Sequence, residues 1–158
     1  MSHQYRATVK WTRGGATFTD QRYSRGHEWS FDGGITVPAS SSPLSVRLPY
    51  SVTEAVDPEE ALVAALASCH MLTFLYVAAK QGFVVNDYAD DAVGEMTKNE
   101  HGKLWVSKII LSPAIAFTGT KRPTPEQLDE LHHLAHEECY IANSIKSEVV
   151  VQGAMSFV

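Results

Sequence analysis

The sequence predicts an α+β domain that spans residues 1–158, and three observations carry that prediction. Residues 5–12 alternate apolar and polar side chains, which is the period of a half-buried strand. Two stretches, residues 57–81 and 124–139, open with strong helix-start signals. Strand-like segments stand before, between and after these stretches. The expected order is therefore β-β-β-α-β-β-α-β, which is typical of the α+β class.

Two more strands are expected in the first third of the chain, after the strand at residues 5–12. A polar connector over residues 19–25 leads to a short strand around residues 28–31. The run Asp-Gly-Gly at residues 32–34 is a hairpin-turn signal, and it leads into a third strand at residues 35–37. Residues 38–49, which include three consecutive serines, are expected to form an elaborated loop rather than a domain boundary.

The central helix carries unusually complete local signals. Asp57 is the expected N-cap, Pro58 occupies the first helical position, and Glu60 completes the spacing of a capping box. Gly82 supplies the stop signal. About 24 residues make a rod of roughly 36 Å that is apolar on nearly all sides. Such a helix needs cover from a sheet and from another subunit, and polar residues at its centre favour a buried helix over a membrane span.

The second half of the chain is expected to add two strands, a helix and a terminal strand. The two strands are placed at residues 88–98 and 103–117. Thr124 is the expected N-cap of the second helix, and Gln127 stands where a capping box needs it. The terminal strand is centred on residues 149–151.

Composition limits the classes of function. The net charge of −5 offers no basic stripe for nucleic-acid phosphates. The first residues lack the apolar segment of a secretory signal. Two cysteines are too few for a disulfide framework, so a reducing, cytoplasmic compartment is expected. Any disulfide would then be transient and chemical.

The two cysteines are the strongest candidates for chemistry. Cys69 lies in the middle of the first helix, and Cys139 closes the second. A cysteine reacts as its thiolate, which a nearby cation stabilises. The helix dipole gives a thiolate at mid-helix little stabilisation, so the cation has to come from elsewhere in the fold. Arg22 and Arg25 of the polar connector are candidates. His70 is adjacent in sequence, but lies about 100° around the helix from Cys69.

The helix start and the two cysteines resemble those of the family that includes osmotically inducible protein C (OsmC) and the organic hydroperoxide resistance proteins (Ohr). In that family an Asn/Asp-Pro-Glu start precedes a reactive cysteine by ten residues from its first glutamate, as Glu59 precedes Cys69 here. A second family cysteine ends the later helix, where Cys139 stands. Two departures are Tyr140, in place of a proline, and His70, in place of an apolar neighbour.

The resemblance implies an OsmC-like fold with a long central helix, an intertwined homodimer, and thiol-dependent reduction of organic hydroperoxides in the oxidative stress response. Cys69 is similar to the peroxidatic cysteine and Cys139 to the resolving one. Glu59 is similar to the glutamate that holds an activating arginine, for which Arg25 is the first candidate and Arg22 the second. The implied partners are an organic hydroperoxide and an external dithiol reductant, such as a lipoylated protein. No cofactor, metal, nucleic acid or membrane is implied.

Two alternatives stay open. The first is a non-catalytic dimer that binds a small apolar ligand and keeps its cysteines buried and inert. The second is a metal-binding protein, since His132 and His136 have the i, i+4 spacing of a metal pair, to which His70 and the cysteines could add. Against the second, those histidines also fit a solvent-facing helix side, and neither C-x-x-C nor H-E-x-x-H occurs.

Overall fold

The computed structural model describes residues 2–158 and confirms the α+β class. The chain divides into two compact units, residues 1–61 and 62–158, and each is described by itself. The prediction that one domain spans residues 1–158 stays a prediction.

The N-terminal unit contains one antiparallel sheet in the order β1-β2-β3. Its strands are β1 (Ala7–Lys10), β2 (His27–Phe31) and β3 (Thr36–Ala39). The hairpin predicted between β2 and β3 is present, and Gly34 adopts a φ of 84°, which suits glycine. The strand expected over residues 5–12 is shorter than predicted, because Trp11 leaves the ladder and its indole Nε1 donates to the Ser24 carbonyl at 2.8 Å.

Helix α1 (Pro58–Lys80) forms as predicted. Its capping box is complete, since the Asp57 Oδ1 accepts from the Glu60 backbone N–H at 2.8 Å and the Glu60 carboxylate accepts from the Asp57 backbone N–H at 3.1 Å. Gly82 ends the helical turn with a φ of 79°. By length and composition α1 could cross a membrane, which is weak evidence because the core helix of a soluble protein passes the same test.

The C-terminal unit contains two three-stranded sheets, β4-β7-β9 and β5-β6-β8. In each sheet the middle strand pairs antiparallel with one neighbour and parallel with the other. The strands are β4 (Val84–Asp90), β5 (Val93–Lys98), β6 (Leu104–Leu111), β7 (Pro113–Thr118), β8 (Glu148–Val151) and β9 (Ala154–Phe157).

The predicted count of strands in this unit was too low. Residues 88–98 and 103–117 each contain parts of two strands, because the chain passes from one sheet to the other near Asp90 and again at Ser112. A hydrogen bond links the two crossings: the Asp90 carboxylate accepts from the Ser112 backbone N–H at 2.7 Å. The apolar pattern continues through the second crossing, so it gave no sign of a break. The last strand, β9, was also missed.

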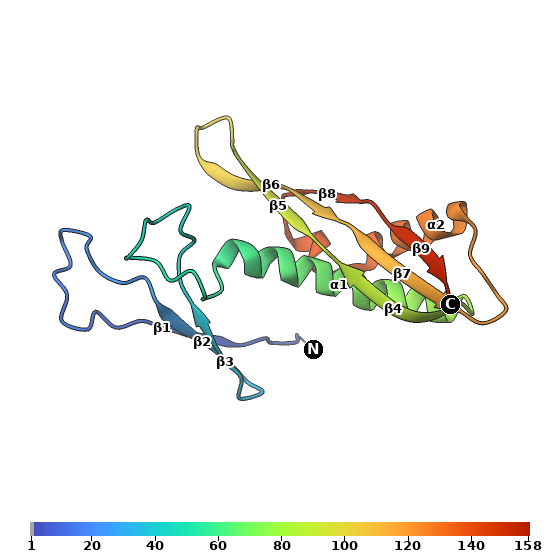
Figure 1. The fold of residues 1–158 in the computed structure, drawn as a ribbon, viewed down its shortest axis with the longest axis horizontal. Coiled ribbons are helices and arrows are strands. Elements are labelled where there is room, and N and C mark those ends of the chain that lie inside the picture. The colour runs from blue at the N-terminus through green and yellow to red at the C-terminus, as the bar shows by residue number, and fades with distance from the viewer. Residues whose placement is uncertain (1) are drawn as a thin grey trace. The chain divides into compact units, whose positions relative to one another are not determined.

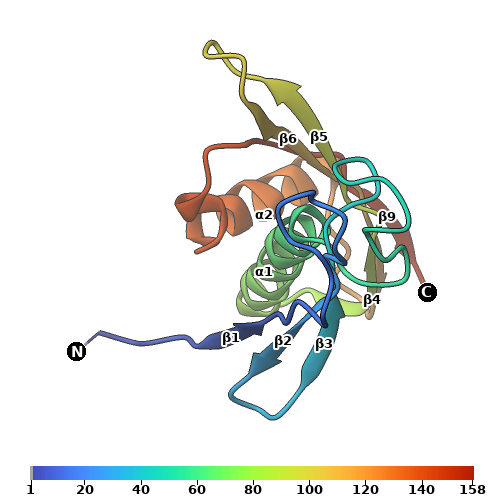
Figure 2. The same ribbon diagram turned by 90° about the vertical axis from the view of Figure 1, so that its left-hand side faces the viewer.

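Helix α2 (Pro125–Glu138) begins at the predicted capping box of Thr124 and Gln127. A single turn of 3₁₀-helix, η1 (Ala142–Ser144), follows it. Figures 1 and 2 show α1 and α2 side by side on one face of strands β4–β9. Two apolar clusters fill the space between the layers: one is built around Phe74 and Phe117, and the other around Leu66, Leu111 and Cys139.

Candidate functional site

The structure brings the two cysteines together in the C-terminal unit. Cys69 lies on α1, is partly exposed, and packs against the apolar cluster that contains Cys139. Cys139 is the C-cap of α2 and its side chain is 0% exposed. Both thiols are free. Two cysteines that are 70 positions apart in the sequence thus become neighbours through the packing of α2 against α1.

The two thiols differ in their electrostatic setting. Burial raises the pKa of the Cys139 thiol to about 11, and a hydrogen bond between Cys139 and Cys69 adds to the rise. Two backbone N–H groups, those of Ala142 and Ile141, oppose it, and the Ala142 N–H lies 3.4 Å from the Cys139 Sγ. The proton therefore stays on Cys139 at neutral pH. The buried Cys139 is a poor nucleophile in the reduced protein, and the partly exposed Cys69 is the better candidate for first attack.

The turn after Cys139 is held without the proline that the resemblance led us to expect. The Asn143 side-chain amide donates to the carbonyls of Glu137 at 2.8 Å and Cys139 at 3.0 Å. The Ser144 hydroxyl donates to the Tyr140 carbonyl at 2.7 Å. Tyr140 itself is 79% exposed. Asn143 is a site residue that the sequence reasoning missed, although Asn is a common backbone-capping residue in turns.

A second polar pair lies in the same unit, between α1 and α2. The His70 Nε2 and the His132 Nδ1 are 3.0 Å apart, and the ring planes are inclined by 13°. Atoms of rings stacked face to face stay roughly 3.5 Å apart, so these imidazoles meet edge to edge in an N–H···N hydrogen bond. His70 is 1% exposed and His132 is 6% exposed. His132 is thus buried, and the expectation that the α2 histidines face solvent is wrong for this residue.

Burial lowers the pKa of both histidines to about 4, and His70 is also repelled by His132 and His136. Both rings are therefore neutral at pH 7. Each neutral ring has one N–H and one bare nitrogen. Within residues 2–158 the outer nitrogens, His70 Nδ1 and His132 Nε2, have no hydrogen-bond partner. A buried polar atom without a hydrogen-bond partner lowers the free energy of unfolding, and two such nitrogens lie at this one junction between α1 and α2.

The predicted arginine, Arg25, is firmly held in the N-terminal unit. Its backbone N–H donates to the Tyr50 carbonyl at 2.8 Å, and its carbonyl accepts from the His27 Nδ1 at 2.7 Å. The tautomer of His27 follows from its other nitrogen, which accepts from the Trp29 indole N–H at 2.9 Å. The Arg25 guanidinium lies 3.9 Å from the centre of the Tyr23 ring, and its Nη1 donates to the Tyr23 carbonyl at 2.6 Å.

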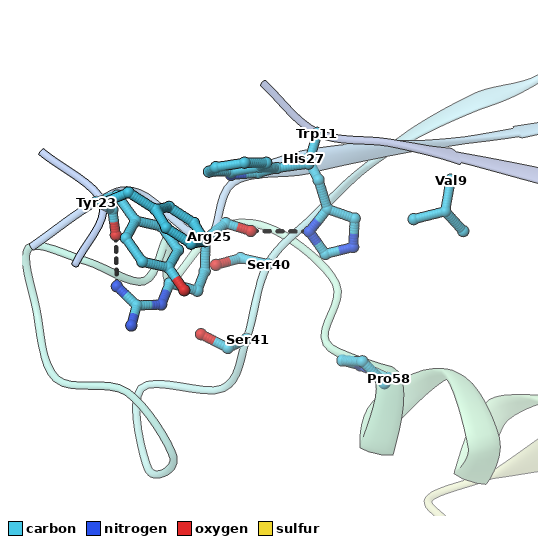
Figure 3. Close-up of a pocket in the computed structure, with 9 residues that line it drawn as sticks. Val9, Trp11, Tyr23, Arg25, His27, Ser40, Ser41 and Pro58 are labelled. Carbon is cyan, nitrogen blue, oxygen red and sulfur yellow. Dashed lines mark hydrogen bonds between the residues drawn. The ribbon is translucent and has the colours of Figure 1, made fainter. Parts of the chain in front are cut away.

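Arg25 lines an open, apolar cavity of about 420 Å³ within the N-terminal unit (Figure 3). Trp11, Phe18 and Tyr23 pack on one another along one wall, with ring centroids 4.8–6.0 Å apart. The second candidate, Arg22, is exposed and donates to the Tyr50 hydroxyl at 2.9 Å. The complete lining of the cavity is Val9, Trp11, Phe18, Tyr23, Arg25, His27, Ser40, Ser41 and Pro58.

Of the two glutamates at the start of α1, only one is committed to the cap. Glu60 closes the capping box, as predicted. In the described part of the chain Glu59 takes part in no ion pair and no side-chain hydrogen bond, so its carboxylate is available. The metal alternative finds no support, since residues 2–158 contain no group of three or more His, Cys, Asp or Glu that could hold an ion.

Comparison with known proteins places these features in context. A model of the OsmC-like protein family matches residues 51–153, more than half of the chain. A solved structure of an OsmC-like protein of unknown function from Vibrio cholerae is 52% identical, with a TM-score of 0.94 over 97% of this chain and 100% of that one. No curated protein matches the sequence.

Two solved structures of organic hydroperoxide resistance proteins share the fold at lower identity. The protein from Elizabethkingia anophelis is 16% identical, with a TM-score of 0.67 over 100% of this chain and 99% of that one. The protein from Bacillus subtilis is 18% identical, with a TM-score of 0.61 over 98% of each chain.

The buried histidine pair predicts a loss of stability in mild acid. In the unfolded chain both pKa values return to about 6.5, so between pH 6.5 and 4 the unfolded state binds more protons than the folded state. The free energy of unfolding is therefore expected to fall by about 2 kcal/mol or more between pH 7 and pH 5. Urea unfolding at the two pH values measures this. The exposed His133→Ala variant should keep the same dependence, while equal stability of the wild type at both pH values would contradict the assignment.

Proposed function

This chain belongs to the OsmC-like family, and from that premise we propose that it is a thiol-dependent peroxidase that reduces organic hydroperoxides. The observation that carries the proposal is the pairing of a partly exposed Cys69 with a buried, protonated Cys139. A reaction of this type needs one thiol that a substrate can reach and a second that waits within reach of the first. Family membership and the hydroperoxide resistance proteins of the same fold support the choice of oxidant.

The reaction would start at Cys69. Its thiolate attacks the outer oxygen of the hydroperoxide, so that an S–O bond forms while the O–O bond breaks. The sulfur is oxidised to a sulfenic acid, and the alkoxide takes up a proton and leaves as an alcohol. The high pKa of Cys139 keeps the second thiol from competing for the peroxide.

Cys139 would act second. Its sulfur attacks the sulfenic sulfur of Cys69, an S–S bond forms, and the hydroxyl of the sulfenic acid leaves with the thiol proton as water. An external dithiol, such as a lipoylated protein, then reduces the disulfide by thiol–disulfide exchange. Because the pair is already in contact, little movement of α2 is needed between the two steps.

Arg25 is our candidate for the cation, with Glu59 as its carboxylate partner. A guanidinium would stabilise both the thiolate and the alkoxide that develops as the O–O bond breaks, and the second effect is the one that speeds the step. The aromatic cavity beside Arg25 supports a preference for hydroperoxides with a hydrocarbon part. Hydrogen peroxide offers no apolar surface to such a cavity.

We further propose that the protein works as a homodimer. Leu72 and Tyr76, four residues apart on the long and largely apolar helix α1, are 61% and 66% exposed in the single chain. An exposed apolar face on a long core helix is typical of a surface that a partner covers.

The division of labour between the cysteines predicts two different defects. Cys69→Ser should lose all consumption of cumene hydroperoxide, because the first nucleophile is gone. Cys139→Ser should reach the Cys69 sulfenic acid with about one equivalent and then stop turning over, because excess peroxide drives that sulfenic acid on to the sulfinic acid with a second equivalent. A peroxidase assay with dithiol, followed by mass spectrometry, separates these outcomes. Turnover that survives in Cys69→Ser would refute the proposal.

The choice of arginine predicts a larger effect for one variant than for the other. Arg25→Ala should slow alkylation of Cys69 by iodoacetamide at pH 7 by about tenfold, because loss of a cation disfavours the thiolate. Arg22→Ala, the matched control, should change the rate by less than about twofold. The measurement is the rate of alkylation against pH, followed by mass spectrometry. Equal curves for both variants would mean that neither guanidinium activates the thiol.

The dimer predicts a solution mass of twice the 17.4 kDa of the chain. Light scattering coupled to gel filtration measures this mass directly. Tyr76→Glu should shift the mass toward that of one chain, because it places a charge on the covered face. As a control, Glu130→Ala on the exposed side of α2 should leave the mass unchanged. A wild-type mass of 17.4 kDa would refute the dimer.

A further inference from the structure

The His70–His132 hydrogen bond joins the same two helices that carry the thiols. His70 follows Cys69 directly on α1, and His132 precedes Cys139 by seven residues, or about two turns, on α2. The helices therefore meet at two polar points, one histidine pair and one thiol pair. Two separated points fix the direction of one helix across another, whereas a single point leaves it free to swing.

The other contacts at this junction are not directional. Phe74, Leu128, Leu131 and Ala135 form the apolar cluster beside the histidines, and such side chains pack nearly as well after a small slide. A hydrogen bond between two rings loses most of its strength when the angle or distance changes. The histidine pair is therefore the contact that selects one arrangement from several of similar apolar burial.

A third element holds His132 from the opposite side. Gly153, between β8 and β9, lies so close to the His132 ring that an added Cβ would overlap with its Nε2. The imidazole thus fills the space beside the glycine backbone, and α2 is set both against α1 and against the strand connection. The chain keeps this arrangement although both outer nitrogens lack a hydrogen-bond partner within residues 2–158.

We propose that His70 and His132 are positioning residues that hold α2 in the register at which Cys139 meets Cys69, so that they govern disulfide formation rather than the attack on peroxide. The proposal rests on the proposed function for its biological consequence. Within residues 2–158 neither histidine forms a hydrogen bond to a sulfur atom, so the pair acts through the placement of α2.

The atoms used by the pair allow a matched test. Asn carries a polar atom as many bonds from Cα as the Nδ1 of histidine, and Gln carries one as many bonds away as the Nε2. His70 bonds through Nε2 and His132 through Nδ1. His70→Gln and His132→Asn therefore keep a polar atom at the right place, and His70→Asn and His132→Gln do not.

The measurement is the equilibrium of the Cys69–Cys139 disulfide with reduced and oxidised glutathione, read by acid quenching, alkylation and mass spectrometry of the full chain. It requires no hydroperoxide and no turnover. His70→Gln and His132→Asn should keep the effective concentration of the thiol pair within about twofold of the wild type. His70→Asn and His132→Gln should lower it by about tenfold, the scale of one lost hydrogen bond.

Gly153→Ala tests the placement of the His132 ring in a chain that keeps both histidines. Its new Cβ should displace the His132 ring and lower the effective concentration as His132→Gln does. The double variant Gly153→Ala/His132→Asn should recover much of the loss, because Asn lacks the Nε2 that would overlap with the added Cβ and keeps only a δ atom, where the ring's Cδ2 would lie 2.9 Å away.

The proposal would be overturned if the four single histidine variants all kept the wild-type effective concentration, or if all four lowered it by the same factor. A purely structural role would depend on side-chain volume and not on which ring nitrogen is matched. A wild-type chain that forms no Cys69–Cys139 disulfide in oxidised glutathione would overturn it too. The matched pattern without any peroxidase activity would support the positioning role and refute only the proposed function. Peroxidase activity without the pattern would do the reverse.

Discussion

The packing of α2 across α1 is the constraint on which the candidate chemistry depends. Cys139 is buried because α2 ends against the cluster of Leu66 and Leu111, and burial is the main reason that its pKa rises to about 11. Cys69 is adjacent but partly exposed. One packing arrangement thus produces both the proximity of the thiols and the difference between them. Polar contacts at this junction include the His70–His132 hydrogen bond and the turn held by Asn143. Hydrogen bonds depend on direction, and apolar burial does not, so these contacts restrict the orientation of α2.

The elements that the sequence predicted well are those with local causes. Both capping boxes join residues three positions apart, so Asp57 with Glu60 and Thr124 with Gln127 could be recognised in the sequence and are present in the structure. The missed strand boundaries have a non-local cause, because the chain changes sheets near Asp90 and again at Ser112, and the apolar pattern continues through the second change. A fold class survives such errors, since it depends on the kinds of elements and not on every boundary.

The candidate site shows the same contrast. His132 was expected on a solvent-facing side because the histidines of α2 spread around the helix. Its partner His70 is 62 positions away in the sequence, and no local pattern predicts the pair. The two cysteines could be coupled only through resemblance to a family, and the structure then places them in one cluster. The roles of Arg25 and Glu59 continue to rest on that resemblance, although Arg25 lines an apolar cavity and the Glu59 carboxylate is available.

We propose that Cys69 and Cys139 form one redox pair that an organic hydroperoxide oxidises. The most direct measurement is mass spectrometry of the wild-type protein after one equivalent of cumene hydroperoxide, with peptide mapping under non-reducing conditions. We expect a loss of two hydrogen atoms per chain and a peptide that links Cys69 to Cys139 within one chain. Consumption of the peroxide with both thiols still free, or a disulfide that joins only different chains, would contradict it.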